Sequence, residues 1–160
     1  MNAANGSGAD DSDARSIVLR QAETSEIAEI RALLAAAYLP VADANDSHVP
    51  CFLVAAETHG IIGTVAVEPC GGYGLLRSLA VRPEARGRGI GRRLVTECET
   101  RARQTGLRGL YLLTTTAERF FGTLGYDELE RWELPESVRR TEAFRSLCPE
   151  SAIAMMKRLL

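Results

Sequence analysis

The sequence predicts a single α+β domain, and three observations lead to that prediction. Its 160 residues are the usual size of one domain and are enough to bury a core without disulfides. Two β-branched runs, 51–57 and 61–68, flank the short turn Thr58-His59-Gly60, a pattern typical of an antiparallel hairpin. From Gly89 onward, the apolar residues recur at the period of a helix.

The first half of the chain is expected to hold most of the strands. Residues 1–16 are almost wholly small or polar, so we expect a disordered tail and a domain that spans 17–160. A short strand at 17–20 precedes a helix that Thr24 caps and that stops before Leu39-Pro40. The stretch 41–50 reads as turns, and Gly71-Gly72 turns the chain into a strand at 74–81. The apolar face expected for the helix is Ile27, Ile30, Leu34 and Tyr38.

The second half is expected to alternate helices and strands. The helix that begins near Gly89 ends at Gly106, and a buried strand follows at 110–113. Thr116 opens a short helix that Gly125 closes before a strand near 126–130. Helical spacing covers much of 135–149, and the last strand is expected at 152–159. The apolar face predicted for the long helix is Ile90, Leu94, Val95, Cys98 and Ala102.

Composition excludes several classes of protein. The 25% charged and 46% hydrophobic fractions are typical of soluble globular domains. The net charge is -2, and acidic residues interrupt the arginines between 77 and 108, so no nucleic-acid partner is expected. No signal-peptide pattern and no bilayer-length apolar run are present, so we expect a cytoplasmic protein without a membrane partner. The four cysteines form no CxxC pair or Cys/His set, so we expect neither a metal site nor a disulfide framework.

The segment 79–91 is the most informative part of the sequence. It reads as a strand, then a loop of alternating arginine and glycine, then the start of an amphipathic helix. The first turn of a helix has unsatisfied N–H groups and a partial positive charge, both of which favour a bound pyrophosphate. Glycines let phosphate oxygens approach the backbone. GxxxxGK[ST] is absent, and GxGxxG would need glycine where Arg92 stands, so neither of those phosphate loops fits.

The run Arg86-Gly87-Arg88-Gly89-Ile90-Gly91 resembles the [Q/R]-x-x-G-x-[G/A] coenzyme A motif of GCN5-related N-acetyltransferases (GNATs). The order of strands and helices around it is similar as well, over about 17–160. This resemblance implies α/β/α layers with about four helices. It also implies a mixed, mostly antiparallel sheet of six or seven strands, splayed between the fourth and fifth.

Acetyl-coenzyme A is the co-substrate that the resemblance implies, with its pantetheine arm paired to free backbone groups of Leu79 and Val81. A backbone N–H near Leu79 or Ala80 is the implied donor to the thioester carbonyl, and no metal takes part. Thr114 stands where the family commonly has asparagine. The residues expected to contact the co-substrate are Leu79, Ala80, Val81, Arg86, Gly87, Arg88, Gly89, Ile90, Gly91, Thr114 and Phe121.

The general base and acid are harder to identify. Glu68 ends a hairpin strand beside the expected cleft and is the candidate base, although a solvated strand-end charge is the alternative. Phe121 occupies the position at which many GNATs carry a tyrosine that acts as the general acid. Either water protonates the departing thiolate, or a hydroxyl such as that of Thr114 or Ser78 assists.

Three stretches, 75–81, 110–116 and 146–152, resemble the arsenic-resistance N-acetyltransferase group, whose characterised branch acetylates the α-amine of arsinothricin, a glutamate analogue. The acceptor is therefore expected to be a small-molecule amine. Arg77 is a candidate for holding a substrate carboxylate or arsinate in a bidentate contact, with a structural ion pair as its alternative. Ser78, Arg139 and Ser146 are further candidates for the acceptor pocket, and surface arginines are the alternative reading of Arg139. Cys70 and Cys148 lie in loops, where thiol–arsenic ligation is a remote reading.

Acetylation of the α-amine of arsinothricin is the reaction that this resemblance implies. Two alternatives stay open: another acceptor, such as an amino acid, a polyamine or a protein N-terminus, or an acyl-coenzyme A sensor without catalysis. A homodimer through the apolar run 152–156 is also expected.

Overall fold

The computed structural model describes residues 16–42, 44–147 and 150–160. The expected tail therefore lies outside the described residues, apart from Ser16, and so does Cys148. Among the described residues, no helix has the length and apolarity needed to cross a bilayer.

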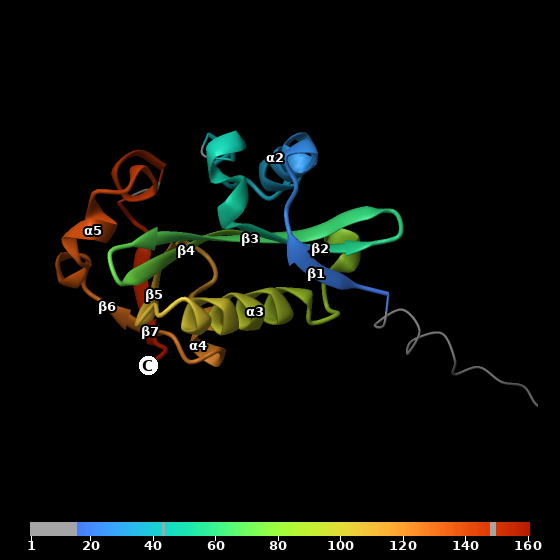
Figure 1. Ribbon diagram of the computed structural model, residues 1–160. Coiled ribbons are helices and arrows are strands. Elements are labelled where there is room, and N and C mark those ends of the chain that lie inside the picture. Colours follow the sequence, from blue (N-terminus) through green and yellow to red (C-terminus); the bar gives the residue numbers. More distant parts are fainter. Residues whose placement is uncertain (1–15, 43, 148–149) are drawn as a thin grey trace, which may run out of the picture.

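Seven strands form one sheet in the order β1-β2-β3-β4-β5-β7-β6 (Figure 1). Every neighbouring pair is antiparallel except β4 and β5, which run parallel. The prediction of an α+β fold with a mixed, mostly antiparallel sheet is confirmed. The strands are β1 (Val18–Gln21), β2 (Phe52–Glu57), β3 (Gly60–Cys70), β4 (Tyr73–Val81), β5 (Gly109–Thr114), β6 (Asp127–Leu129) and β7 (Ile153–Arg158).

Four α-helices in the described part of the chain lie on the two faces of this sheet, which confirms the three layers. Figure 1 shows α2 (Ile27–Ala36) and α5 (Glu136–Arg139) on one face, and α3 (Ile90–Gln104) and α4 (Glu118–Thr123) on the other. Shorter helical turns join them. These are η1 (Thr24–Glu26), η2 (Asp46–Cys51), η3 (Pro83–Ala85), η4 (Arg131–Glu133) and the π-turn η5 (Ala143–Leu147).

The core is divided by the sheet into three apolar clusters. Beneath α3, Leu94 and Leu112 belong to the largest cluster, which holds the apolar helix face predicted from the sequence. Beneath α2, Ile30 and Phe52 belong to a second cluster, and beneath α5 Val138 belongs to a third. The two smaller clusters share one face of the sheet, with the region around Arg77 between them.

Two expectations about the first helix are wrong. α2 ends at Ala36, and Tyr38 lies beyond it with a φ of 59° and a side chain that is 96% exposed. Tyr38 therefore does not belong to the buried helix face. Thr24 does not cap the helix either, because the chain first makes the η1 turn, in which the Glu23 N–H donates to the Glu26 carboxylate at 2.8 Å. Helical spacing could not reveal that the last turn unwinds.

The apolar run 152–156 is not available as a dimer interface. β7 lies inside the sheet, paired with β5 on one side and β6 on the other. Ala154 and Met155 are buried within the chain. The run is apolar because it fills the core of its own domain, and the homodimer itself stays a prediction.

Candidate active site

The sheet opens between β4 and β5. These strands pair only where Gly74 faces Leu110 and Leu75 faces Tyr111, although both continue further. A bulge bends β4 just beyond this point. Ala66 of β3 faces Arg77 while Thr64 faces Ala80, so two residues of β4 stand against one of β3. Such a bulge takes a residue out of the regular ladder and turns the strand away from its neighbour.

Ser78 is the bulged residue, and its backbone carries the distortion. Its φ of 58° lies in the left-handed region, which a residue with a Cβ adopts rarely. Backbone outliers of this kind concentrate at binding and catalytic sites. The splay between the fourth and fifth strands that the family resemblance implied is confirmed.

A cavity of about 900 Å³ fills this opening. Its walls include residues from both faces of the sheet: Phe121 and Ile90 from the α3 side, and Leu39 and Ala143 from the α2 and α5 side. The cavity therefore reaches past the sheet edge toward both helical layers. That is a suitable shape for two substrates that enter from different sides.

One end of the cavity is the loop before α3. Gly87 and Gly89 have φ values of 80° and 75°, and a Cβ added at either would meet no atom within 4 Å. The backbone there is open to a ligand, next to the N-terminal N–H groups of a 15-residue helix. Arg86 and Arg92 also line this end. The expected phosphate-binding geometry is present.

Arg88 has a different role from its neighbours in the loop. It lies outside the lining, and its guanidinium ion-pairs with Glu57 at 3.6 Å. Glu57 is the last residue of β2, so this pair ties the loop to the β2–β3 hairpin. Arg88 supports the loop rather than extending into the cavity.

The middle of the cavity follows the open edge of β4. Leu79, Ala80 and Val81 line it on one side, and Phe121 lines it from α4. The Phe121 ring is 4% exposed and packs edge-on against Tyr126 at 5.4 Å. A bound thioester chain would meet an apolar wall at this position.

A buried polar network holds Tyr126 behind that wall. Its hydroxyl donates to Glu99 of α3 at 3.0 Å, and Lys157 of β7 donates to the other oxygen of Glu99 at 2.9 Å. Burial, with the Glu99 charge beside it, raises the pKa of Tyr126 above its ordinary value. The network joins α3, β7 and the segment after α4, and so fixes the position of Phe121.

At the opposite end from the phosphate loop, Arg77 lines the cavity near the α2 face. Its Nε donates to Glu68 at 3.3 Å, its Nη1 donates to the Ser78 hydroxyl at 3.3 Å, and its guanidinium lies 5.6 Å from the centre of the Phe52 ring. The Arg77 side chain is 9% exposed. These contacts hold the guanidinium in one orientation at the edge of the cavity.

The charged residues of the described lining are Arg77, Arg86 and Arg92. With Arg86 and Arg92 beside the phosphate loop, Arg77 supplies the charge at the other end. Both ends of the described lining therefore carry positive side chains, and that of Arg77 is paired with Glu68 just outside the lining.

A family model for the acetyltransferase (GNAT) domain matches residues 48–128, which include β2 to β5, the phosphate loop and α4, and end within β6. The chain belongs to the GNAT acetyltransferase family. The resemblance seen in the Arg/Gly motif is confirmed at the level of the family. The family model does not distinguish the arsenic-resistance group from other GNATs.

Known relatives agree with membership of the GNAT family. An uncharacterised N-acetyltransferase of Chlorobaculum tepidum is 34% identical over 119 residues, covering 70% of this chain and 73% of that protein. An amino-acid acetyltransferase of Ralstonia nicotianae is 39% identical over 87 residues, covering 52% of this chain. That match covers 19% of the Ralstonia protein, so this chain corresponds to only a small part of it.

Among solved structures, N-acetylglutamate synthase of Neisseria gonorrhoeae, complexed with coenzyme A and N-acetyl-glutamate, superposes with a TM-score of 0.79. The two chains are 24% identical, and the superposition covers 90% of this chain and 35% of that one. At that identity the match supports the fold alone.

Most candidate residues of this GNAT domain lie together. Leu79, Ala80, Val81, Gly87 and the other predicted co-substrate contacts line the cavity, apart from Arg88. Thr114 lines it too, and its hydroxyl accepts a hydrogen bond from the Ala117 N–H at 2.9 Å, which starts the turn into α4.

The catalytic and acceptor candidates are more dispersed. Glu68 lies next to the cavity but outside its lining, joined to it through Arg77. Arg139 is exposed on α5 and outside the lining, and the side chain of Ser146 lies outside the described residues. Cys70 is buried beneath α5, and burial raises the pKa of its thiol to about 11. That leaves it protonated and poorly nucleophilic at neutral pH.

Sequence reasoning missed the cavity wall formed by 37–40 and Ala143. The signal available at 37–40 was the Leu-Pro pair, which indicated that the helix stops nearby, although α2 already ends at Ala36. The pair gave no information about where the chain goes next. Within the described ranges, no group of three or more His, Cys, Asp or Glu residues is placed to hold a metal.

Proposed function

We propose that this GNAT enzyme transfers the acetyl group of acetyl-coenzyme A to the α-amine of a small, anionic, amino-acid-like acceptor. The observation that carries the proposal is the charge pattern of the cavity: arginines near the phosphate loop at one end, and Arg77 at the other. The name of the related amino-acid acetyltransferase of Ralstonia nicotianae supports the same proposal.

The pyrophosphate of the co-substrate would bind at the α3 N-terminus, where Gly89 leaves room for phosphate oxygens. The pantetheine arm would follow the unpaired edge of β4 toward the bulge. Ser78 and Leu79 lie in the bulge, between the paired residues Arg77 and Ala80. A backbone N–H of Leu79 or Ala80 would donate to the thioester carbonyl oxygen.

In the reaction, the neutral amine attacks the thioester carbon, the C–S bond breaks, and the amine loses a proton. Glu68 is our candidate for accepting that proton through a water molecule, because it lies beside the cavity rather than in it. The thiolate leaves as a weak base, which water or the hydroxyl of Thr114 or Ser78 protonates. Phe121 is 4% exposed and has no hydroxyl, so it does not act as the acid.

Arg77 would bind the acceptor carboxylate in a bidentate contact. Its ion pair with Glu68, the structural alternative considered from sequence, sets the guanidinium plane. In this proposal the same guanidinium also binds the acceptor. The acceptor would then lie between Arg77 and the thioester. A glutamate-like molecule meets this requirement, and arsinothricin, with an arsinate in place of a carboxylate, is the finer form of the proposal.

The test is thiol release from acetyl-coenzyme A with arsinothricin, phosphinothricin, glutamate, spermidine and a short peptide as acceptors. We expect turnover with the anionic amino acids. Arg77→Ala should raise the acceptor KM by about 100-fold, the effect of losing a buried charge-assisted contact of about 3 kcal/mol. Arg139→Ala removes an exposed arginine outside the cavity and is the matched control. Turnover confined to spermidine or peptide would reject the anionic acceptor.

Phe121 lacks the hydroxyl that would act as the general acid, and this favours a second candidate function. That candidate is a sensor that binds acyl-coenzyme A without transferring the acyl group. The same experiment separates the two candidates. Calorimetric binding of coenzyme A without thiol release for any acceptor would support the sensor and reject the transferase.

A further inference from the structure

Tyr38 has a backbone conformation that suits glycine far better than tyrosine. The Leu39 N–H donates to the carbonyl of Leu34 at 3.0 Å, and the Tyr38 N–H donates to that of Ala35 at 3.1 Å. These are the two hydrogen bonds of a Schellman motif, with Tyr38 as the left-handed residue at its φ of 59°. Glycine is the usual residue there because a Cβ is strained in that conformation.

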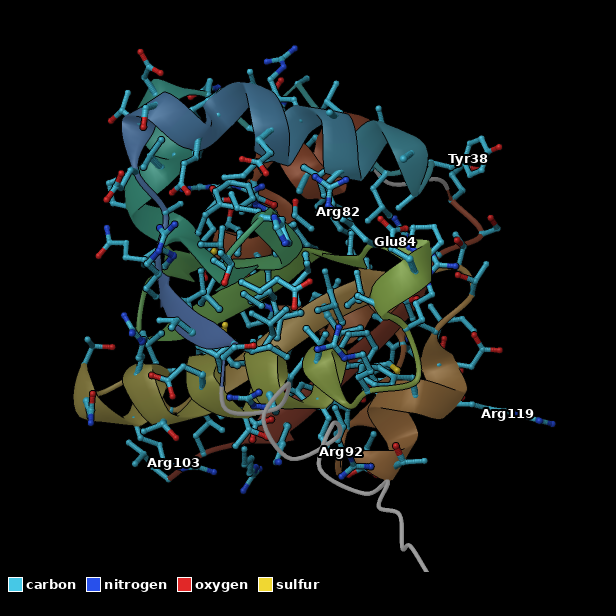
Figure 2. All side chains as sticks on the ribbon, turned by 90° about the vertical axis from the view of Figure 1, so that its right-hand side faces the viewer. Tyr38, Arg82, Glu84, Arg92, Arg103 and Arg119 are labelled. Carbon is cyan, nitrogen blue, oxygen red and sulfur yellow. The ribbon has the colours of Figure 1, made fainter. Side chains whose placement is uncertain are left out.

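The Tyr38 side chain gains little from its own fold. It is 96% exposed, and Figure 2 shows it projecting beyond the end of α2. A buried ring would offset the backbone strain through apolar contacts, but a ring this exposed does not. The free protein therefore contains an aromatic residue in a strained position without a matching structural benefit.

The position of Tyr38 indicates what the ring contacts instead, namely a ligand in the cavity. Together with Leu39 and Pro40, Tyr38 lines the same cavity as Arg77 and Ser78, and Leu39 packs with the cluster beneath α2. The segment 37–40 thus forms a wall on the α2 side, the side on which Arg77 stacks on Phe52. Strained residues at the mouth of a cavity commonly take part in binding.

We propose that Tyr38 is a specificity-determining residue whose ring packs over the acceptor amino acid once it is bound between Arg77 and the thioester. This inference rests on the proposed function, since it requires an acceptor at that end of the cavity. The ring would cover the aliphatic part of the acceptor and exclude water from the reacting amine, while Arg77 holds the carboxylate. The co-substrate, bound along β4 and at the phosphate loop, would not depend on Tyr38.

The decisive variant is Tyr38→Gly, compared with Tyr38→Phe and with Trp132→Ala. Glycine relieves the strain and removes the ring, whereas phenylalanine keeps both. Trp132 is a 73% exposed aromatic residue outside the cavity lining and controls for the loss of an exposed ring. The readouts are melting temperature, acceptor KM, acetyl-coenzyme A KM and the Kd of coenzyme A by calorimetry.

We expect Tyr38→Gly to raise the melting temperature by about 2–4 °C, because glycine adopts the left-handed conformation without strain. The same variant should raise the acceptor KM at least about tenfold, through the lost ring packing. The KM for acetyl-coenzyme A and the Kd of coenzyme A should stay within about twofold of wild type. Tyr38→Phe and Trp132→Ala should keep the wild-type acceptor KM within about threefold.

Different results identify different failures. An unchanged acceptor KM in Tyr38→Gly, with normal wild-type turnover, overturns the role of Tyr38 and leaves the proposed function standing. A loss in Tyr38→Phe equal to that in Tyr38→Gly also overturns ring packing, because the hydroxyl would then carry the effect. Weaker coenzyme A binding in Tyr38→Gly would show that the ring contacts the co-substrate rather than the acceptor, and would overturn the proposed role of Tyr38. Wild-type protein that acetylates no acceptor rejects the proposed function and this inference together.

Discussion

Replacing Gly89 by alanine separates backbone strain from loss of ligand binding. Gly89 is the N-cap of α3, with φ 75° and ψ 15°, and a Cβ there would meet no protein atom within 4 Å. In the free protein, the substitution therefore introduces strain but no clash. At the other end of α3, Gly106 has φ 83° and equally open surroundings, so Gly106→Ala is a matched control.

The expected magnitudes follow from this comparison. A left-handed conformation costs a residue with a Cβ about 1–2 kcal/mol more than glycine, so each variant should lose about that free energy of unfolding. Only Gly89→Ala places a methyl group where a pyrophosphate would approach the helix N-terminus. We expect its affinity for coenzyme A to fall at least about tenfold, or about 1.4 kcal/mol, and that of Gly106→Ala to stay unchanged.

Urea unfolding measures the first quantity and isothermal titration calorimetry with coenzyme A measures the second. Equal stability losses with a selective affinity loss in Gly89→Ala would confirm that the loop binds phosphate. Wild-type affinity in Gly89→Ala would refute the reasoning, because the open space would then not be the ligand position. An equal affinity loss in Gly106→Ala would show instead that strain anywhere in α3 weakens binding.

Two further predictions concern the buried groups. Glu99→Ala should lower the free energy of unfolding by about 3 kcal/mol, because it removes the shared partner of Tyr126 and Lys157. Glu136→Ala is the control: it breaks an exposed ion pair on α5 and should change the free energy of unfolding by less than about 0.5 kcal/mol. Burial raises the pKa of the Cys98 thiol to about 12 from an ordinary 9.0. The thiol of the unfolded chain therefore ionises at lower pH than that of the folded chain. The free energy of unfolding should fall above pH 9, by up to about 1.4 kcal/mol per pH unit for this group. Urea unfolding at pH 8–10 measures this slope, and Cys98→Ala should reduce it.

The fold could be predicted from sequence wherever the apolar period is long or the turn chemistry is strong. The helix from Ile90 has a complete apolar face, and the hairpin turn at 58–60 was correctly placed. Tyr38 shows the limit of this reasoning: its spacing fits the helix face, but the helix ends two residues earlier, at Ala36. Periodicity reports which residues can share a face, and it does not report where the last turn opens.

The candidate site also has one part that the sequence predicts and one part that it does not. The phosphate loop is contiguous in sequence and depends on backbone N–H groups, so Gly87 and Gly89 could be found from local pattern. The acceptor end is assembled from 37–40, β4 and Ala143, which are far apart in the chain. No local pattern connects those segments, because their proximity depends on the order of strands in the sheet.

The sequence by itself determined the α+β class and the strand–loop–helix at Gly89, and the resemblance of its Arg/Gly motif indicated the GNAT family. The class and the strand–loop–helix depend on short-range periodicity, glycine conformation and helix-end electrostatics, which are encoded within a few residues. Only the tertiary structure decided that Glu68 reaches the cavity through Arg77, and that Arg88 braces the loop against Glu57. It also decided that β7 lies inside the sheet and that Tyr38 stands exposed at the cavity wall. Such relations arise when distant segments pack and the bulge at Ser78 separates two strands, and nothing in the local sequence specifies them.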